Sequence, residues 1–560
     1  MSSHTTRRLF PRIAGAAVVC GVGSFSAITT INDDWDDYTN FFSQHQQQKS
    51  DQPNERIVIL GSGWGGLSAL RKCCGPNKDI VIISPRPHFL YTPLLAGSAV
   101  GTIALQSACE PIRALVAQAA SKSSSVTYVR ADARHIDVEN KRVYATEDGV
   151  MDLELSYDKL LVAVGAQTNT FGVPGVQEYG LFLKEAEDSA KLHAKLLSNL
   201  ERASALIGIG DHEKYSDEIN RLLKIVVVGA GPTGVELAAE LADFKEYDVK
   251  RLYGEEIASR LQITLVEALP RILGPFDKDL ADVAKKHLMD RGVDVRTGVA
   301  VTRVDSPKVA TFAPSTPRDA TPEEKADALA QAKTEPIGTL VWAGGIGPRP
   351  LVQKLARSLG QSDTRGLKVD ECQRVVGADG VYAIGDAALD GYAPTAQVAT
   401  QQGKHIGRAF RDGVDRPFVY KHAGSLCSLG HGNGIAQLVA PNNAAINIWD
   451  VIGAPAVGPN NDQRAVTGLP AFAMWRSLYW SKLLSNSSRL SLSMDWLKAQ
   501  LTGREVAGPV LQRKGTYIPS KGSNTVRAVE CFGTPLRRNP TIARVSEMVE
   551  EKKSKRFGFF

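Results

Sequence analysis

The chain has 560 residues, 43% of them apolar and 22% charged, which predicts a folded protein of two to four domains with a sizeable core. Its formal charge of +6 lies at the ends: residues 504–560 carry 12 Lys or Arg against 5 Asp or Glu, and Arg7, Arg8 and Arg12 precede the first acid. This placement favours an anionic membrane surface and argues against nucleic acid as a partner.

The N-terminal region predicts a targeting segment. Arginines among Ser and Thr, without acids, are typical of an organelle presequence, and the charge-free run 13–31 has about the length that crosses a bilayer. We interpret residues 1–55 as a mitochondrial targeting segment followed by a polar linker. A retained anchor and a secretory signal are the alternatives.

The first folded unit begins with a strand, a glycine-rich turn and a helix. An apolar run at 56–60 precedes Gly61, Gly63 and Gly66, and a second apolar run follows at 79–83. In this G-x-G-x-x-G fingerprint the glycines permit a tight turn, a close approach of backbone amides to a pyrophosphate, and close packing of helix on strand. Ser84-Pro85-Arg86 stands where a ribose-binding carboxylate is usual, so we expect the ribose to be bound differently.

The same arrangement recurs in the middle of the chain. The strand at 224–228 precedes Gly229, Gly231 and Gly234, and the strand 262–266 ends in Glu267. A carboxylate there accepts hydrogen bonds from a free ribose 2′-hydroxyl and repels a 2′-phosphate, which favours NADH over NADPH, although the nearby Arg271 opposes this. The long interval before Glu267 predicts a helical extension at 245–260.

Four further segments complete the two units. Residues 306–335 form an insert with four prolines followed by a short charged helix; it has no calcium-loop motif, so we expect no calcium dependence. The apolar runs 160–166 and 340–345, the latter ending at Gly345, are predicted to be the crossovers between the two units. The strand 380–384 leads to Gly-Asp, and Asp386 is a candidate partner for a flavin ribitol; a helix-capping Asp is the alternative.

The cysteines predict neither a disulfide framework nor a metal site, because none of the seven forms a C-x-x-C pair. Cys73 and Cys74 are adjacent on the first predicted helix and are interpreted as packing residues. Disulfide reductases of this architecture carry C-x4-C after that helix, but the segment 89–95 has no thiol. Electrons must therefore leave a flavin by a route without cysteines, which also argues against a sulfide:quinone reductase.

Near the C-terminus, apolar residues recur at helical spacing in two stretches, punctuated by basic residues: Phe472, Trp475, Tyr479 and Leu483, then Leu490, Met494, Leu497 and Leu501. The pattern predicts two amphipathic helices, aromatic on one side and basic on the other, that lie in a bilayer interface or pack on the body or on a second subunit. The tail beyond residue 503 is predicted to be weakly ordered.

Several segments together resemble the type II NADH:quinone oxidoreductases, the alternative NADH dehydrogenases, and most closely the fungal and protist mitochondrial forms. They are Gly-Ser-Gly-Trp-Gly, Ser-Pro-Arg with Thr-Pro-Leu-Leu, the run from Asn169, Val-Val-Val-Gly-Ala-Gly-Pro-Thr-Gly-Val-Glu, Leu-Val-Glu-Ala-Leu-Pro, and the run from Pro394. The resemblance covers residues 56–503. It implies an α/β fold with two Rossmann-type dinucleotide-binding domains and a C-terminal amphipathic helical, membrane-associating region.

The resemblance also implies site residues. The cofactor sites comprise Gly61, Gly63, Gly66, Arg86, Thr92, Gly345 and Asp386 for FAD and its surroundings, and Gly229, Gly231, Gly234, Glu236 and Glu267 for NADH. The quinone site comprises Gln397, Thr400, Gln401, Trp475 and Tyr479, with Glu236 and Gln397 as the catalytic candidates. The alternative role of Glu236 is structural: it would be an acid in the first turn of a helix, stabilised by the helix dipole. Thr400 stands where some relatives have His, so we expect the quinone's proton from water or from solvent linked to Thr400 and Gln401.

These observations predict domains and a reaction. Residues 56–180 and 351–465 are expected to form the FAD-binding domain, 181–350 the NADH-binding domain, 466–503 the membrane or dimer helices, and 504–560 a basic tail. The expected reaction is hydride transfer from NADH to FAD and two-electron reduction of ubiquinone, without proton pumping, by a homodimer peripheral to the mitochondrial inner membrane. The alternatives are a soluble NADH oxidase and an NADH-sensing flavoprotein like the apoptosis-inducing factors.

Overall fold

The computed structural model describes residues 54–120, 125–147, 151–210, 212–317, 319–439, 455–457 and 463–506. The predicted targeting segment and nearly all of the predicted basic tail lie outside the described residues. Within these ranges, no helix has both the length and the apolar character needed to span a membrane.

The first Rossmann unit is built on a parallel sheet with buried strands. Side chains of β1 alternate between two hydrophobic cores, because successive residues of a strand point to opposite faces: Ile57 and Ile59 join one core, Val58 and Leu60 the other. Helices α3 (Trp64–Cys73), α5 (Ile112–Ala120) and α14 (Ala396–Asp412) contribute to the first core, and α13 (Pro350–Ser358) to the second. The strand order is β21 (Val381–Ala383), β9 (Lys159–Val162), β1 (Glu55–Leu60), β2 (Lys78–Ile83), β5 (Ser125–Val129).

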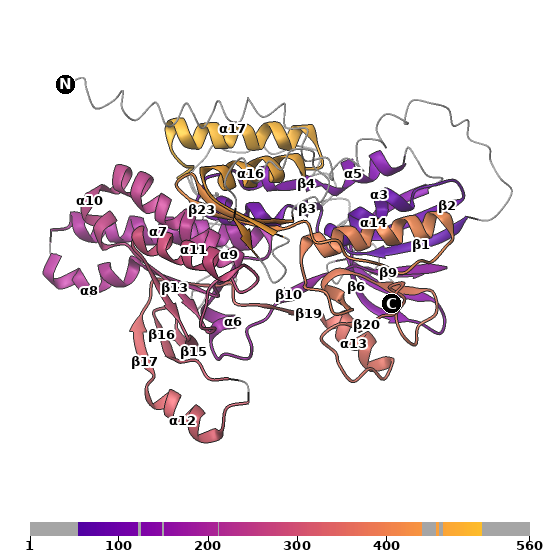
Figure 1. The fold of residues 1–560 in the computed structure, drawn as a ribbon, viewed down its shortest axis with the longest axis horizontal. Helices are drawn as coiled ribbons and strands as arrows, with labels where there is room; N and C mark the ends of the chain where they lie inside the picture. Colours follow the sequence, from indigo (N-terminus) through magenta and orange to yellow (C-terminus); the bar gives the residue numbers. More distant parts are fainter. Residues whose placement is uncertain are drawn as a thin grey trace, which may run out of the picture. The chain divides into compact units, whose positions relative to one another are not determined.

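The second unit repeats this plan. Its parallel sheet has the order β11 (Leu181–Phe182), β18 (Thr339–Trp342), β12 (Lys224–Val228), β13 (Gln262–Glu267), β14 (Val293–Thr297). It is accompanied by α7 (Ala186–Gly208), α8 (His212–Leu222), α9 (Pro232–Asp243) and α11 (Lys278–Asp290). The predicted crossovers lead into β10 (Ala166–Thr168) and β19 (Ile346–Pro348), which pair antiparallel between the two units (Figure 1). The predicted fold class is confirmed.

The segment 245–260 is helical, as its length suggested. Helix α9 continues into a π-helical turn, η5 (Phe244–Val249), and then into α10 (Lys250–Arg260), which is interrupted by a kink at Gly254, where φ is +89°. A π-helical turn widens the helix by about one residue per turn and therefore shifts which side chains share a face.

The prediction of residues 306–335 as an insert needs correction. This segment supplies β16 (Val309–Pro314) and β17 (Lys333–Pro336), which pair with β15 (Val299–Ser306) in one antiparallel sheet. Val301, Val304 and Phe312 bury their side chains in a common core, so the segment is part of the domain. The charged helix predicted there is α12 (Pro322–Ala330), at the lower end of this sheet in Figure 1.

The C-terminal part forms a sheet covered by two helices. Strands β23 (Ser425–Gly430), β24 (Asn433–Val439), β26 (Gln463–Gly468) and β25 (Ala456–Val457) pair in that order. Helix α16 (Leu469–Ser481) packs on this sheet, and α17 (Asn486–Thr502) lies outermost (Figure 1).

The two predicted helices exist, and their apolar stripes follow different ones of the predicted alternatives. The first apolar stripe faces inward, since Trp475 and Leu483 are buried. The second stripe faces outward: Leu490, Met494, Leu497 and Leu501 are 66%, 56%, 39% and 67% exposed.

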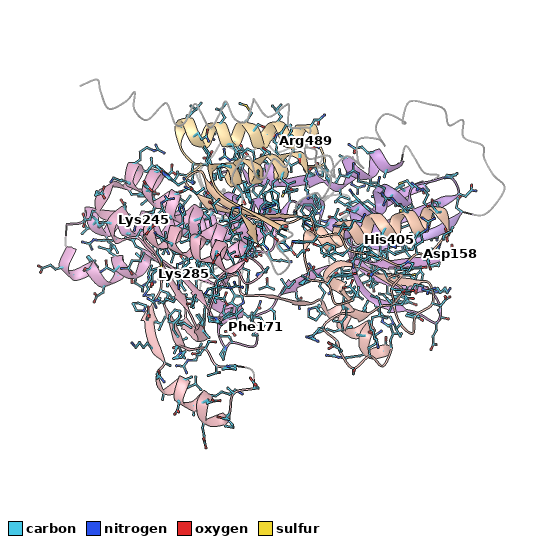
Figure 2. All side chains as sticks on the ribbon, viewed as in Figure 1. Asp158, Phe171, Lys245, Lys285, His405 and Arg489 are labelled. Atoms are coloured by element: carbon cyan, nitrogen blue, oxygen red, sulfur yellow. The ribbon has the colours of Figure 1, made fainter. Side chains whose placement is uncertain are left out.

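A continuous basic side is absent from the described part of these helices. The Arg476 guanidinium lies 4.7 Å from the ring centroids of both Phe472 and Trp496. Arg489, labelled in Figure 2, donates to the carbonyl oxygens of Ser481 and Leu483 at the end of α16. These guanidinium groups stabilise rings and terminal carbonyls within the protein.

Arg504, just after α17, is also used internally. Its side chain is 9% exposed and forms ion pairs with Asp248 at 3.0 Å and with Glu240 at 3.2 Å. The π-helical turn η5 carries Asp248 and α9 carries Glu240, so Arg504 fixes the end of the C-terminal layer to the second Rossmann unit.

Candidate dinucleotide and acceptor sites

Both glycine-rich turns leave no room for side chains. Gly61 and Gly229 have φ values of +103° and +97°, which only glycine adopts readily. A Cβ on Gly66 would lie 1.9 Å from the Gly61 carbonyl oxygen, and a Cβ on Gly234 would lie 1.9 Å from the Gly229 carbonyl oxygen. The same close approach of helix to strand therefore occurs twice, as the spacing predicted.

The second glycine of each turn leaves open space beside a helix N-terminus. Gly63 and Gly231 are the N-cap residues of α3 and α9, and neither helix shows a side-chain hydrogen bond at its cap among the described residues. A Cβ on Gly231 would meet no described atom within 4 Å, and one on Gly63 would meet only the Arg86 guanidinium, at 3.8 Å. The amides of both N-termini are thus accessible to a pyrophosphate, and the residues fit two dinucleotides.

The strand ends beside the two turns differ chemically. In the second unit, the Glu267 carboxylate accepts hydrogen bonds from the amides of Ala230 (2.6 Å) and Leu269 (2.9 Å). These bonds hold the carboxylate beside the glycine turn, where it can meet a ribose. In the first unit, the buried Ser84 hydroxyl pairs with that of Ser62 at 2.8 Å instead.

Arg86 belongs to an ion-pair group that sequence reasoning did not find. Its guanidinium donates to Glu185 at 2.9 Å, and Arg349 donates to the other oxygen of Glu185 at 3.1 Å. Glu185 caps α7, and Arg349 also donates to the carbonyl oxygen of Val164 at a crossover. The three charges come from distant parts of the chain, and their sequence context gave no signal for the group.

The remaining predicted cofactor residues lie around the same region. Asp386 lies in a short turn after β21, with Lys184 Nζ 3.8 Å from its carboxylate. Thr92 accepts a hydrogen bond from the Trp64 indole at 3.3 Å, which ties the segment 92–94 to the start of α3. At Gly345 a Cβ would lie 2.6 Å from the ring of Phe171, an exposed residue labelled in Figure 2.

The first turns of α14 contact the predicted flavin region. The buried Gln402 accepts a hydrogen bond from the Gly385 amide at 2.7 Å and donates to Asp390. A Cβ on Gly385 would lie 3.0 Å from Ala399. Gln402 was missed from the sequence, although its place among apolar residues on the inner face of an amphipathic helix was a usable signal.

Glu236 is buried on α9, two residues after Gly234. Its carboxylate accepts hydrogen bonds from the Ser428 amide at 3.1 Å and from the Trp475 indole at 2.9 Å. Burial raises the pKa of Glu236 to about 8, although both hydrogen bonds oppose that shift. At neutral pH the group is therefore mostly a neutral carboxylic acid that contacts both β23 and α16.

Aromatic side chains connect this carboxyl to the first Rossmann unit. The rings of Trp475 and Tyr479 meet edge to face with centroids 4.8 Å apart, and Tyr479 meets Tyr91 at 6.0 Å. Tyr91 in turn contacts Trp64 at 5.0 Å. The predicted acceptor residues of α16 thus lie where the two Rossmann units and the C-terminal layer meet.

The other predicted acceptor residues lie on α14. The Gln397 amide bonds to the backbone at Ala423 and Gly424, and the Gln401 amide bonds to the backbone of Lys421. The Thr400 hydroxyl donates to the Ala396 carbonyl oxygen at 2.7 Å, within the helix.

Two protein-family models match the chain, one over its dinucleotide-binding part and one over its C-terminal part. Residues 55–403 match the family model of the pyridine nucleotide-disulphide oxidoreductases, and residues 422–505 match the NDH2 C-terminal domain. The chain is similar to the external alternative NADH-ubiquinone oxidoreductase of Yarrowia lipolytica, with 32% identity over 514 residues that cover 82% of each chain.

Two further relatives agree with this match. The external NADH-ubiquinone oxidoreductase 2 of Saccharomyces cerevisiae is 33% identical over 490 residues, which cover 80% of this chain and 82% of the relative. The structure of NDH2 from Plasmodium falciparum in complex with NADH superimposes with a TM-score of 0.69 at 26% identity, over 81% of this chain and 99% of that one.

Proposed function

This chain belongs to the type II NADH:quinone oxidoreductases, and we propose that it oxidises NADH through bound FAD and reduces ubiquinone by two electrons at a membrane surface. The observation that carries the proposal is the convergence on Glu236: a buried carboxyl of the second Rossmann unit bonds to Trp475 of the C-terminal layer, and that layer contacts the first unit through Tyr479. The binding sites for NADH, FAD and quinone can therefore lie next to one another.

The chain's own residues have distinct tasks in this proposal. FAD, when bound, supplies the hydride chemistry between the two substrates. Gly61, Gly63, Gly66, Arg86, Thr92 and Asp386 hold it, and Gly345 lies at the crossover beside it. Gly229, Gly231 and Gly234 admit the pyrophosphate of NADH, and Glu267 selects the free ribose hydroxyl. Positioning and exclusion of water are the protein's main contributions to such a reaction.

Glu236 is proposed to exchange a proton between the NADH side and the acceptor side. A group with a pKa near the working pH is suited to this, because it gains and loses a proton at comparable cost. Gln397 is proposed to orient the quinone, with Thr400, Gln401, Trp475 and Tyr479 around its entrance, as the family resemblance implies.

The outward stripe of α17 supports membrane attachment. Its four exposed apolar side chains recur at helical spacing on one face, and monomeric soluble proteins rarely expose such a continuous face. Leu469 and Trp480 add exposed apolar area on the neighbouring α16. We place the protein in the mitochondrion, by analogy with relatives that are named mitochondrial. The family resemblance further implies the inner membrane, a homodimer through the C-terminal helices, and a reaction without proton pumping.

Steady-state NADH oxidation tests this function against its rivals. We expect rapid turnover with a short-chain ubiquinone and slow turnover with oxygen alone. A soluble NADH oxidase would turn over equally well without quinone, and an NADH-sensing flavoprotein would reduce its flavin but pass electrons poorly to quinone. The proposal fails if the reduced flavin is not reoxidised by quinone under anaerobic conditions.

A further inference from the structure

A short strap lies across the first turns of α14 on the predicted quinone segment. The strap, residues 418–424, is the second half of the connection between α14 and β23. Two glutamine amides of α14 hold it. Gln401 exchanges two hydrogen bonds with the backbone of Lys421, at 2.8 and 3.0 Å. Gln397 accepts from the Ala423 amide at 2.9 Å and donates to the Gly424 carbonyl oxygen at 3.3 Å.

These backbone contacts fix the orientation of the Gln397 amide. The Ala423 N–H requires an acceptor, which identifies Oε1, and the Gly424 carbonyl oxygen requires a donor, which identifies Nε2. The Tyr420 hydroxyl lies 2.6 Å from the same Oε1 and must donate to it, because an amide oxygen has no proton. Tyr420 has a single proton, so its remaining contact, with His422 Nδ1 at 3.0 Å, must be one in which the imidazole donates.

The hydrogen bonds therefore have one direction, from His422 to Tyr420 to Gln397. His422 is exposed to solvent, whereas Tyr420 and Gln397 are half-buried. Burial raises the pKa of the Tyr420 hydroxyl, which keeps it protonated at neutral pH. The inner end of the series therefore lies in the first turns of the helix that also bonds, through Gln402, to the turn that holds Asp386.

Quinone reduction needs this kind of connection. Conversion of a quinone to a quinol takes two electrons and two protons, and a hydride supplies only one of the protons. The neighbouring Thr400 is not a suitable source, because its hydroxyl donates to the Ala396 carbonyl oxygen inside the helix. The Gln401 amide is bonded on both atoms to Lys421.

We propose that Tyr420 is the proton donor to the quinone, that His422 reprotonates it from solvent, and that Gln397 orients its hydroxyl; this rests on the proposed function. FAD, when bound, would supply the quinone with two electrons and one proton in the form of a hydride. The second proton leaves the Tyr420 O–H bond and forms the O–H bond on the other quinol oxygen, which replaces Gln397 Oε1 as the acceptor. The tyrosinate then takes the Nδ1–H proton of His422 while the imidazole ring takes a proton from water on Nε2, so that solvent is the net source of the proton.

The energetic demand on this step is small. The quinol oxygen that accepts the proton is a phenolate, the same kind of base as the tyrosinate that is left behind. Solvent protons that arrive through the exposed imidazole complete the transfer, and a positioned proton donor of this type contributes about 10²–10⁴ in rate.

The test is Tyr420→Phe, which keeps the ring and removes only the hydroxyl. Anaerobic stopped-flow measures flavin reduction by NADH, then reoxidation by a short-chain ubiquinone or by ferricyanide, which takes electrons without a proton. We expect unchanged reduction by NADH, unchanged reoxidation by ferricyanide, and reoxidation by quinone slower by about tenfold or more. Tyr392→Phe is the matched control, since the Tyr392 ring packs against Tyr420 at 5.6 Å outside the series.

Equal reoxidation by quinone in the wild type and Tyr420→Phe would overturn the proposal. So would an equal loss with both acceptors, which would show that Tyr420 merely anchors the strap. If the wild type is reoxidised by ferricyanide but not by quinone, the proposed function fails instead.

A second readout needs no turnover. Nitrogen NMR of the resting enzyme, with His422→Asn used for assignment, should show His422 protonated on Nδ1 when its ring is neutral. An Nε2 tautomer would reverse the assigned direction and refute the relay.

Discussion

Glu236→Gln removes an ionisable group from the junction while preserving its contacts. The amide oxygen of the variant can still accept the hydrogen bonds from the Ser428 amide and the Trp475 indole, so packing is retained. The variant lacks the ionisable carboxyl, whose pKa in the wild type is raised by burial from an ordinary 4.5 to about 8. In its folding, the variant should therefore differ from the wild type mainly in how its free energy of unfolding depends on pH.

The sign and size follow from proton binding. Because the folded-state pKa lies above the unfolded one, the native protein keeps a proton that the unfolded chain releases once the pH exceeds 4.5. The wild type loses stability relative to the variant as the pH rises from about 4.5 to about 8, and the difference is constant outside this window. At about 1.4 kcal/mol per pH unit, the full difference is roughly 5 kcal/mol.

Chemical denaturation of both proteins between pH 5 and pH 8.5 measures this difference, and subtraction cancels all other titrating groups. Infrared difference spectra give an independent value, because the protonated carboxyl band of Glu236 should titrate near pH 8 and be absent from the variant. A stability difference that is the same at both ends of the range, or a carboxyl that is already ionised at pH 6, would refute the reasoning.

Three other outcomes are expected. Glu267→Ala should lower the preference for NADH over NADPH in kcat/KM by roughly tenfold or more, because the carboxylate beside the turn would no longer repel a 2′-phosphate. Gly231→Ala should raise the KM for NADH with unchanged FAD content, since its methyl group would occupy open space, whereas Gly234→Ala should destabilise the domain, since its Cβ would lie 1.9 Å from a backbone oxygen. Serine at all four positions of the α17 stripe should release the protein from anionic vesicles, at a cost of about 2–4 kcal/mol of binding, in a co-sedimentation assay.

Each of these expectations has an outcome that would contradict it. Unaltered nucleotide preference in Glu267→Ala would remove that residue from the ribose site. Equal effects of the two glycine variants would mean that Gly231 has a purely structural role. For the α17 stripe, serine at four comparably exposed apolar positions of the second Rossmann unit should leave vesicle binding intact: Leu252, Val283, Met289 and Leu329. Retained binding by the stripe variant would contradict the membrane assignment.

The sequence by itself determined the features that depend on local backbone geometry. The positive φ values at positions 61 and 229 favour glycine, and the close approach of helix to strand at positions 66 and 234 leaves room only for glycine. These glycines recur at the same spacing in both turns, so the sequence alone reveals the turns. Glu267 was found for the same reason, because it ends the strand that follows the turn. Buried parallel strands and the helical spacing of α16 and α17 were equally local signals.

Only the tertiary structure decided what those elements contact. Burial raises the pKa of Glu236, and one of the groups that contact its carboxyl is Trp475, 239 residues away in sequence. The orientation of Tyr420 likewise depends on an amide of α14. Residues 306–335 were predicted to be an insert, because the pairing of their strands with β15 becomes visible only in the folded sheet. Arg504 was counted with the basic tail, because its carboxylate partners on α9 and η5 are far away in the sequence. Periodicity shows which side chains of a helix share a face, but burial and ion pairing depend on what packs against that face, and this is set by contacts between segments far apart in the chain.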